Sequence, residues 1–223
     1  MDFIFMLTRE DATVEDCLDV LASIKPLGLK HIGFKDVGVD GDTLYELNRR
    51  IRVTGAKTYM EVVSTTHAEC MASVRTAVEV GVDCLLGGTA VEEVLETIRG
   101  TGIEYFPFPG RPEGHPTRLG GDARRIAEDC TRFLDQGCAG VDLLAYRATE
   151  AQPIELVRAA RKALGGAGRL IVAGSVDSAA TVRELDEAGV DAFTIGSAVF
   201  EGAFSPRKGL VRSQLNDVLT ACT

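Results

Sequence analysis

Tryptophan is absent from this sequence, histidine occurs only three times, and aromatic residues make up 6% of the chain. His31, His67 and His115 show no spacing that suggests a shared site, which argues against a zinc centre, because zinc needs clustered ligands. The six cysteines include no Cys-x-x-Cys pair. We therefore expect buried free thiols, as in a reducing cytosol, rather than disulfides or a redox pair.

An excess of basic residues is also missing, since 24 Lys and Arg stand against 33 Asp and Glu, for a net charge of −9. Binding to nucleic acid needs clustered Lys and Arg, so the composition argues against such a partner. No apolar run reaches the length of a membrane span, and residues 1–7 lack the basic start of a signal peptide. These absences predict a cytoplasmic protein that does not bind membranes.

The sequence does contain a repeated unit, in which a helical segment ends at a glycine and a short apolar strand follows. The helical segments carry apolar residues at intervals of three and four positions, as in residues 14–21 and 91–98. Eight strands are expected, at residues 3–7, 31–36, 57–63, 84–88, 104–109 and 143–146, and after Gly168 and Gly189.

Alternating strands and helices predict a parallel sheet, and eight such units predict its closure into a barrel. The expected fold is α/β, a single (β/α)8 TIM barrel that forms one domain over residues 1–223. An open doubly wound sheet is the alternative, but it gives no reason for eight units of nearly equal length.

The last two strands both end in Gly-Ser, within Leu-Ile-Val-Ala-Gly-Ser-Val-Asp-Ser (170–178) and Ala-Phe-Thr-Ile-Gly-Ser-Ala-Val-Phe (192–200). Glycine lets backbone N–H groups come close to a ligand, and a following helix start adds partial positive charge. In a (β/α)8 barrel, the loops after strands 7 and 8 commonly bind phosphate. The two segments therefore predict a phosphorylated small-molecule ligand.

The segment 108–121 is longer than most connections between a strand and a helix. It carries three prolines and four glycines, together with Arg111, His115 and Arg118. Loops on this face of a barrel build active sites, so we interpret the segment as a cover for the substrate. A surface excursion without a role is the alternative.

Lys35 and Glu61 are expected near the carboxyl ends of adjacent strands, where they can share a site. They fit either a proton-transfer pair beside a carbonyl or a structural ion pair, and both interpretations stay open. Because strand side chains alternate, Lys35 and Asp36 face opposite sides, and we favour Lys35 as the functional residue. A magnesium ion held by Asp36 and Glu61 through waters is a further alternative.

Asp142 also has two interpretations. It could join the site opposite Lys35, or it could belong to a repeated Gly-Val-Asp strand entry, as Asp83 and Asp191 do. The repetition favours the structural role, and Arg147, beyond the end of the same strand, is better placed to act on a ligand.

The segments 171–179 and 189–200 resemble the C-terminal quarter of the ribulose-phosphate-binding barrels. This resemblance implies that the backbone amides of Gly174, Ser175, Gly196 and Ser197 hold a phosphate. The chain is most similar to the N-acylmannosamine-6-phosphate 2-epimerases, which pair a lysine with a glutamate. Their glutamate lies on a different strand from Glu61, so its role is not transferred. The Asp-x-Lys-x-x-Asp signature of the gulonate-phosphate decarboxylases is absent.

These observations predict an isomerase or epimerase that acts on a small phosphorylated sugar. Glu61 would move a proton beside the carbonyl, Lys35 would polarise the oxygen, and Arg147, Arg111 or His115 would neutralise charge. No cofactor or resident metal is required, although Mg²⁺ stays an alternative. The rivals are an aldolase with a Schiff base on Lys35, a magnesium-assisted decarboxylase and a non-catalytic sugar-phosphate sensor. The apolar final helix suggests a dimer.

Overall fold

The computed structural model describes residues 1–62, 64, 66–114 and 116–222. Eight parallel strands form one sheet in the spatial order β10, β11, β12, β1, β4, β5, β6, β7. Their bounds are β1 Asp2–Met6, β4 His31–Lys35, β5 Lys57–Val62, β6 Cys84–Gly87, β7 Glu104–Phe106, β10 Gly140–Leu143, β11 Arg169–Val172 and β12 Ala192–Ile195.

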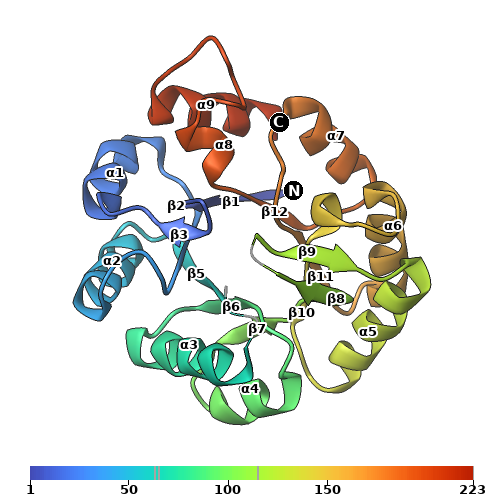
Figure 1. Ribbon diagram of the computed structural model, residues 1–223. Helices are drawn as coiled ribbons and strands as arrows, with labels where there is room; N and C mark the ends of the chain where they lie inside the picture. The colour runs from blue at the N-terminus through green and yellow to red at the C-terminus, as the bar shows by residue number, and fades with distance from the viewer. Residues whose placement is uncertain (63, 65, 115, 223) are drawn as a thin grey trace.

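The two ends of this sheet meet. The N–H of Ala139 donates to the carbonyl oxygen of Tyr105 at 3.0 Å, and the N–H of Asp142 donates to that of Pro107 at 3.1 Å. These bonds join the strand regions of β7 and β10 and close the barrel seen end-on in Figure 1. The predicted (β/α)8 barrel is therefore confirmed.

Helices surround the barrel (Figure 1). Their bounds are α1 Cys17–Ile24, α2 Gly41–Val53, α3 His67–Val80, α4 Val91–Thr97, α5 Ala123–Asp135, α6 Pro153–Leu164, α7 Ala179–Glu187, α8 Ser197–Phe200 and α9 Val211–Ala221, with 3₁₀ turns η1 Lys25–Leu27 and η2 Ala145–Arg147. Four of the helices begin at a residue whose side chain accepts a backbone N–H three residues later, which stabilises the first turn. These residues are Asp40, Thr66, Asp122 and Ser178.

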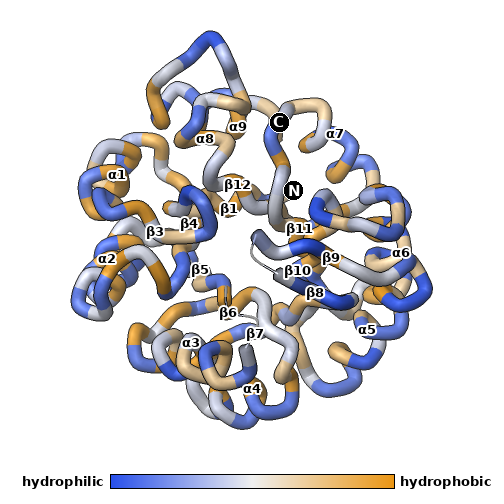
Figure 2. Tube along the Cα trace, in the orientation of Figure 1, coloured by the Kyte–Doolittle hydropathy of each residue, from blue (hydrophilic) through white to orange (hydrophobic). Residues whose placement is uncertain are grey.

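Side-chain alternation divides the core into two parts. Outward-facing strand residues, such as Phe34 and Met60, pack against the helices. Inward-facing residues fill the barrel itself, and they are Ile4, Met6, Tyr59, Cys84, Leu86, Phe106, Ile171 and Ala192. In Figure 2 the hydrophobic colours concentrate on the strands and on parts of the helices, in agreement with this arrangement. The barrel is therefore a packed core, and polar chemistry is confined to its rim.

The sixth barrel strand, β10, begins earlier than predicted. It covers Gly140–Leu143, and residues 145–147 form the 3₁₀ turn η2 instead of continuing the strand. The residue that corresponds to Asp83 and Asp191, two positions after the glycine that ends a helix, is Ala139. The assignment of Asp142 to the repeated strand entry was therefore wrong, because Asp142 lies inside the strand.

Two small antiparallel hairpins stand on the end of the barrel that faces the viewer in Figure 1. The first, β2 Thr8–Arg9 with β3 Ala12–Thr13, follows β1 directly. The second, β8 Arg111–Glu113 with β9 Arg118–Gly120, lies within the long segment 108–121. The N–H of Thr149 donates to the carbonyl oxygen of Leu119 at 3.0 Å, which fastens the second hairpin to the segment after η2.

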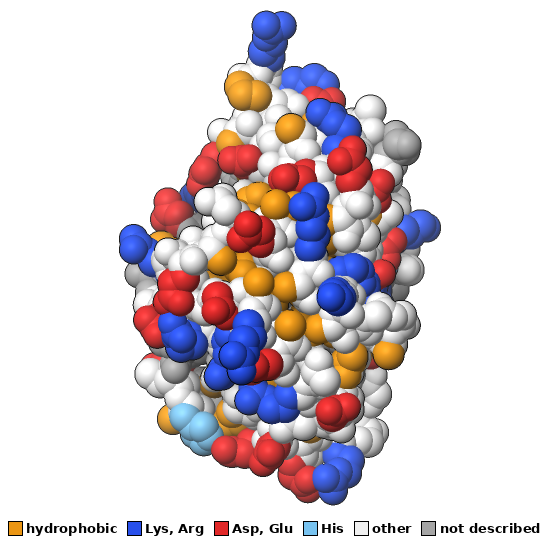
Figure 3. Space-filling view, turned by 90° about the vertical axis from the view of Figure 1, so that its right-hand side faces the viewer, with side chains coloured by type: hydrophobic (Ala, Val, Ile, Leu, Met, Phe, Trp, Pro, Cys, Tyr) orange, Lys and Arg blue, Asp and Glu red, His pale blue; other side chains and the backbone are white. Residues whose placement is uncertain are grey.

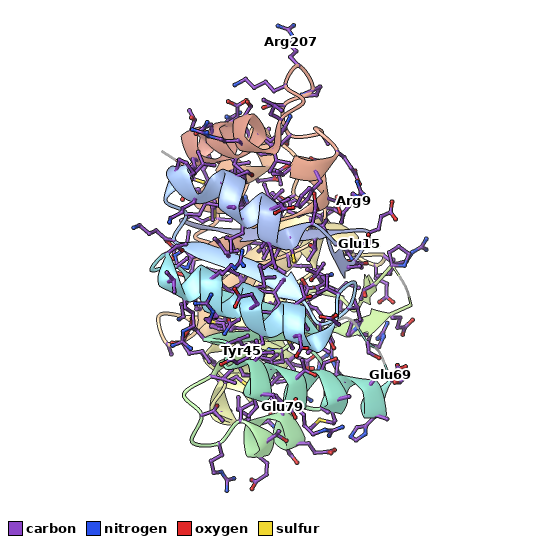
Figure 4. All side chains as sticks on the ribbon, turned by 90° about the vertical axis from the view of Figure 1, so that its left-hand side faces the viewer. Arg9, Glu15, Tyr45, Glu69, Glu79 and Arg207 are labelled. Carbon is purple, nitrogen blue, oxygen red and sulfur yellow. The ribbon has the colours of Figure 1, made fainter. Side chains whose placement is uncertain are left out.

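The outer surface is polar and mixed in charge. The face in Figure 3 carries acidic and basic side chains close together, with small apolar areas between them. In Figure 4, Tyr45 on α2 and Glu79 on α3 lie on the outside of the helical layer. Across the described ranges, no helix combines the length and apolar character needed to cross a membrane. All six cysteines are free, and five of them are buried.

We expect the interior of the barrel to dominate stability. Ile4 is fully buried inside it, so Ile4→Ala should lower the free energy of unfolding by about 2–5 kcal/mol through lost burial and the cavity left behind. Val53 is 74% exposed, and Val53→Ala should change the free energy of unfolding by less than about 0.5 kcal/mol. Urea denaturation of the two variants measures both values, and equal effects would contradict this account of the core.

Candidate functional site

A cavity of about 320 Å³ opens at the carboxyl ends of the strands, between the β2–β3 hairpin and the loops after β11 and β12. Six ionic side chains line it, and they are Asp11, Lys35, Glu61, Arg147, Asp177 and Glu201. The cavity also contains the backbone of both Gly-Ser segments. It therefore brings together Lys35, Glu61, Arg147, Gly174, Ser175, Gly196 and Ser197, which the sequence predicted as site residues.

Lys35 lies between two carboxylates. Its Nζ atom is 2.7 Å from Oδ1 of Asp11 and 3.2 Å from Oε1 of Glu61, and its side chain is 5% exposed. The register pairs Lys35 directly with Glu61 on the adjacent strand, so both point into the barrel. Burial acts to lower the pKa of Lys35, but the charges of Glu61 and Asp11 outweigh it and raise that pKa. Lys35 is thus a buried ammonium ion.

Asp11 was missed by the sequence analysis. It occupies the two-residue turn of the β2–β3 hairpin, where Glu10 and Asp11 both have positive φ, at 52° and 59°, as a type I′ turn requires. Thr13 fixes the hairpin to Lys35, because its hydroxyl donates to the Lys35 carbonyl at 2.7 Å and accepts the Lys35 N–H at 2.8 Å. The hairpin therefore presents Asp11 to the lysine.

The sequence held only a weak signal for this arrangement. Glu-Asp is not the Asn-Gly or Asp-Gly pair that usually marks such a turn, although aspartate does tolerate the left-handed region. Burial opposes ionisation of Asp11, but the charges and hydrogen bonds of Lys35 and Arg147 outweigh it and hold the pKa of Asp11 at about 2. Asp11 is therefore ionised at neutral pH.

Arg147 links this ionic cluster to the first Gly-Ser segment. Its Nη2 atom lies 3.3 Å from Oδ1 of Asp11, and Nη1 donates to the carbonyl oxygen of Thr117 at 3.5 Å. A side-chain carbon added at Gly174 would come within 2.5 Å of the Nε atom of Arg147, so the guanidinium group lies directly over that residue. Arg147 thus lies between Asp11 and the backbone of Gly174.

The two Gly-Ser segments form the opposite wall of the cavity. Gly174 and Ser175 both have positive φ, at 77° and 58°, which turns the backbone sharply after β11. At Gly196 a side-chain carbon would lie 2.6 Å from the hydroxyl oxygen of Thr8, so only glycine fits. The backbone N–H of Glu10 donates to the Ser197 hydroxyl at 3.3 Å. The first N–H groups of α8, which begins at Ser197, have no partner within that helix.

Asp142 lies below the ionic cluster. It is fully buried on β10, between Val141 and Leu143, which face the helices, so its own side chain points into the barrel. Within the described part of the chain, neither carboxyl oxygen has a hydrogen-bond partner. Burial and the charge of Glu61 raise the pKa of Asp142 well above its usual range, despite Lys35 and Arg147. The surroundings of Asp142 therefore favour its protonated form.

Other residues considered from the sequence lie elsewhere. Arg111 is half-exposed and forms an ion pair with Glu150 at 2.6 Å, so the structure does not bring it to the cavity. Asp36 faces α3, where it accepts a hydrogen bond from Ser73 at 2.5 Å. His115 lies outside the described residues, so its role stays a prediction.

The proposed magnesium ligands do not converge. Asp36 faces the helix layer and Glu61 faces the cavity, so the structure does not bring these two carboxylates together. Among the residues with described positions, no group of three or more histidine, cysteine, aspartate or glutamate side chains is arranged to hold a metal ion.

No protein-family model matches the sequence, and no curated protein is similar to it. Solved structures share its fold. Native KDPGal has a TM-score of 0.69 at 12% identity, over 99% of this chain and 96% of that chain. 3-Hexulose-6-phosphate synthase gives 0.68 at 12% identity, over the whole of both chains. Orotidine 5′-phosphate decarboxylase from Pyrococcus horikoshii OT3 gives 0.65 at 13% identity, over 99% of this chain and 98% of that chain.

These structures support the (β/α)8 barrel fold that was expected from the sequence. At 12–13% identity the likeness concerns the fold alone, because one barrel supports many reactions. The chemistry of this chain must be argued from its own cavity.

The state of Asp142 can be tested through stability. Its raised pKa means that the folded protein keeps a proton that the unfolded chain loses above about pH 4. Wild type should therefore lose stability relative to Asp142→Asn as the pH rises, by up to about 1.4 kcal/mol per pH unit. Urea denaturation of both proteins at pH 4.5, 6 and 8 measures the difference. A difference that does not depend on pH would show that Asp142 is ionised in the folded state.

Proposed function

We propose that this protein is an enzyme that isomerises or epimerises a small phosphorylated sugar by proton transfer next to a carbonyl group. The observation that carries the proposal is the buried Asp11–Lys35–Glu61 cluster, which lies in the same cavity as the two Gly-Ser segments. The Gly-Ser segments suit a phosphate because their backbone can approach it closely and donate N–H groups.

The roles of the residues follow from their charges. Glu61 is the base that removes the proton on the carbon beside the carbonyl, and Lys35 donates a hydrogen bond to the oxygen that gains negative charge. Asp11 holds the ammonium group of Lys35 in place at 2.7 Å. Arg147 offsets the phosphate charge from its position over Gly174. The arrangement fixes the sugar at its phosphate end and places its carbonyl at the cluster.

The alternative is cleavage or formation of a carbon–carbon bond. It is supported by the names of proteins with the same fold, which include a synthase and a decarboxylase. A lysine can protonate the carbanion or enolate of such a reaction as readily as that of an isomerisation. A Schiff base on Lys35 is less well supported, because it requires a neutral amine, whereas two carboxylates raise the pKa of Lys35.

Binding of phosphate can be tested at Ser175, whose side chain is exposed and whose positive φ both aspartate and asparagine tolerate. A sugar phosphate at 100 times its Kd should add about 2.7 kcal/mol of stability to wild type. Ser175→Asn should keep this gain, and Ser175→Asp should lose it through charge repulsion. Thermal denaturation with C3 to C6 sugar phosphates, with and without Mg²⁺, measures the effect. If no phosphate compound stabilises wild type, the proposal fails.

Proton transfer can be tested with the compound that binds. Wild type should exchange the hydrogen on the carbon beside the carbonyl with solvent deuterium, as detected by NMR. Glu61→Gln keeps the shape of the side chain but removes the base, and should slow this exchange by about 10²- to 10⁴-fold. Glu79→Gln, on the outside of α3, makes the same chemical change away from the cavity, so it is the matched control and should leave the exchange nearly unchanged.

The same compound separates proton transfer from the Schiff-base route. Treatment with borohydride should leave Lys35 unmodified by mass spectrometry, because the proposed reaction forms no covalent adduct. A reduced substrate adduct on Lys35 would replace the isomerase proposal with an aldolase.

A further inference from the structure

The cations of the cavity are paired with carboxylates before any ligand binds. Among the described residues that line it, the cations are Lys35 and Arg147. Lys35 contacts two carboxylates, and Arg147 shares one of them, Asp11. No lining cation is left over for an additional anion.

The remaining lining charges are negative. Asp177 and Glu201 stand at the exposed rim, so two cations face four carboxylates in the cavity as a whole. Among the described lining residues, the two Gly-Ser segments supply the backbone N–H groups at which the phosphate is proposed to bind. A second anionic group near Glu61 and Asp11 would be desolvated beside like charges without a partner.

Neutral polar groups of a ligand, by contrast, can form hydrogen bonds with side chains of the cavity. Thr8 and Thr194 are buried residues that line the cavity, and a hydroxyl group both donates and accepts hydrogen bonds. Neither hydroxyl donates to or accepts from another described side chain, so both are available to the hydroxyl groups of a sugar. The ammonium group of Lys35 is suited to a carbonyl oxygen.

From this distribution of charge we propose that the substrate carries its phosphate as its one anionic group, on a neutral hydroxylated aldose or ketose, and that phosphorylated sugar acids are excluded. The inference rests on the proposed function, because it assumes that the Gly-Ser segments hold the phosphate. It narrows that function, since a decarboxylase must accept a carboxylate in its substrate.

The test compares matched compounds that differ in the acid group. The pairs are dihydroxyacetone phosphate with 3-phosphoglycerate, ribulose 5-phosphate with 5-phosphoribonate, and fructose 6-phosphate with 6-phosphogluconate. Affinities are measured by titration calorimetry at fixed ionic strength and pH 7.5. For the pair of the best-fitting length, we expect the neutral compound to bind wild type at least tenfold more tightly than the acid.

Two variants locate the cause of the selectivity. Asp11→Asn leaves Arg147 without its carboxylate partner, so the preference for the neutral compound should fall at least fivefold. Glu79→Gln removes a negative charge on the outside of α3, away from the cavity, and should change the preference less than twofold, because water screens that charge. Thermal denaturation of each variant confirms that it folds before its affinity is measured.

The outcomes separate the two proposals. If an acid binds wild type as tightly as its neutral partner or more tightly, and Ser175→Asp abolishes that binding, the phosphate site stands and the inference is overturned. An equal change of preference in Asp11→Asn and Glu79→Gln would also overturn it. If no compound of any pair binds, the phosphate site itself fails, and the inference fails with it.

Discussion

A lysine side chain buried in a barrel needs negative charge close by. This requirement determines which residues surround Lys35 at the carboxyl ends of the strands. An unpaired ammonium group in such a place would be strongly destabilising, and removing one partner of a buried ion pair typically costs about 3–5 kcal/mol. Lys35 meets the requirement twice, with Glu61 supplied by the neighbouring strand and Asp11 supplied by a hairpin. The β2–β3 hairpin, its two residues of positive φ and its attachment through Thr13 all serve to bring Asp11 there.

Stability and chemistry occupy different levels of the same barrel. The residues that fill the inside of the barrel, such as Ile4 and Ala192, are apolar apart from Tyr59. The hydroxyl of Tyr59 is hydrogen-bonded to His31 at 2.9 Å. Above it come Lys35, Glu61 and Asp142, where burial raises the pKa of Asp142 and neighbouring carboxylates raise the pKa of Lys35. The lower layers therefore hold the strands in register, and that register places the charged residues of the upper layer opposite one another.

Much of this arrangement could be predicted from the sequence, and the reasons for the exceptions are specific. The barrel could be predicted because each repeat, a helix that ends at a glycine followed by a strand, is visible in a short stretch of sequence. Lys35 and Glu61 could be paired because adjacent parallel strands end at the same edge. Asp142 was assigned wrongly because Gly140, which lies inside β10, was taken for the glycine that ends a helix. The strand was therefore predicted to start later than it does.

The sequence analysis missed Asp11 and misplaced Arg111 for a different reason. The conformation of a loop does not follow a repeating pattern of residues. The turn that directs Asp11 inward lacks the usual glycine, and the ion pair that holds Arg111 at the surface involves Glu150, far away in the sequence. Side chains on strands can be assigned by counting residues, whereas side chains on loops depend on contacts that only the folded chain provides.

Backbone strain is concentrated at the carboxyl ends of the barrel strands. Among the described residues, the non-glycine positions with positive φ are Glu10, Asp11 and Ser175, and two of them line the cavity while Glu10 donates to Ser197 of its wall. Such conformations cost about 1–3 kcal/mol each and persist where the surrounding structure holds them. Their position on either side of one cavity agrees with a site that is preorganised for its ligand.

Preorganisation also explains why the fold alone says little about the reaction. Barrels at 12–13% identity share the fold, whereas the reaction depends on the side chains that each chain places at its site. In this chain the carboxylates of the cluster are already paired with Lys35 and Arg147 before a ligand binds. In the proposed reaction, negative charge that develops on a substrate oxygen would meet one ammonium group held by two carboxylates, which would favour proton transfer over covalent attack by the lysine.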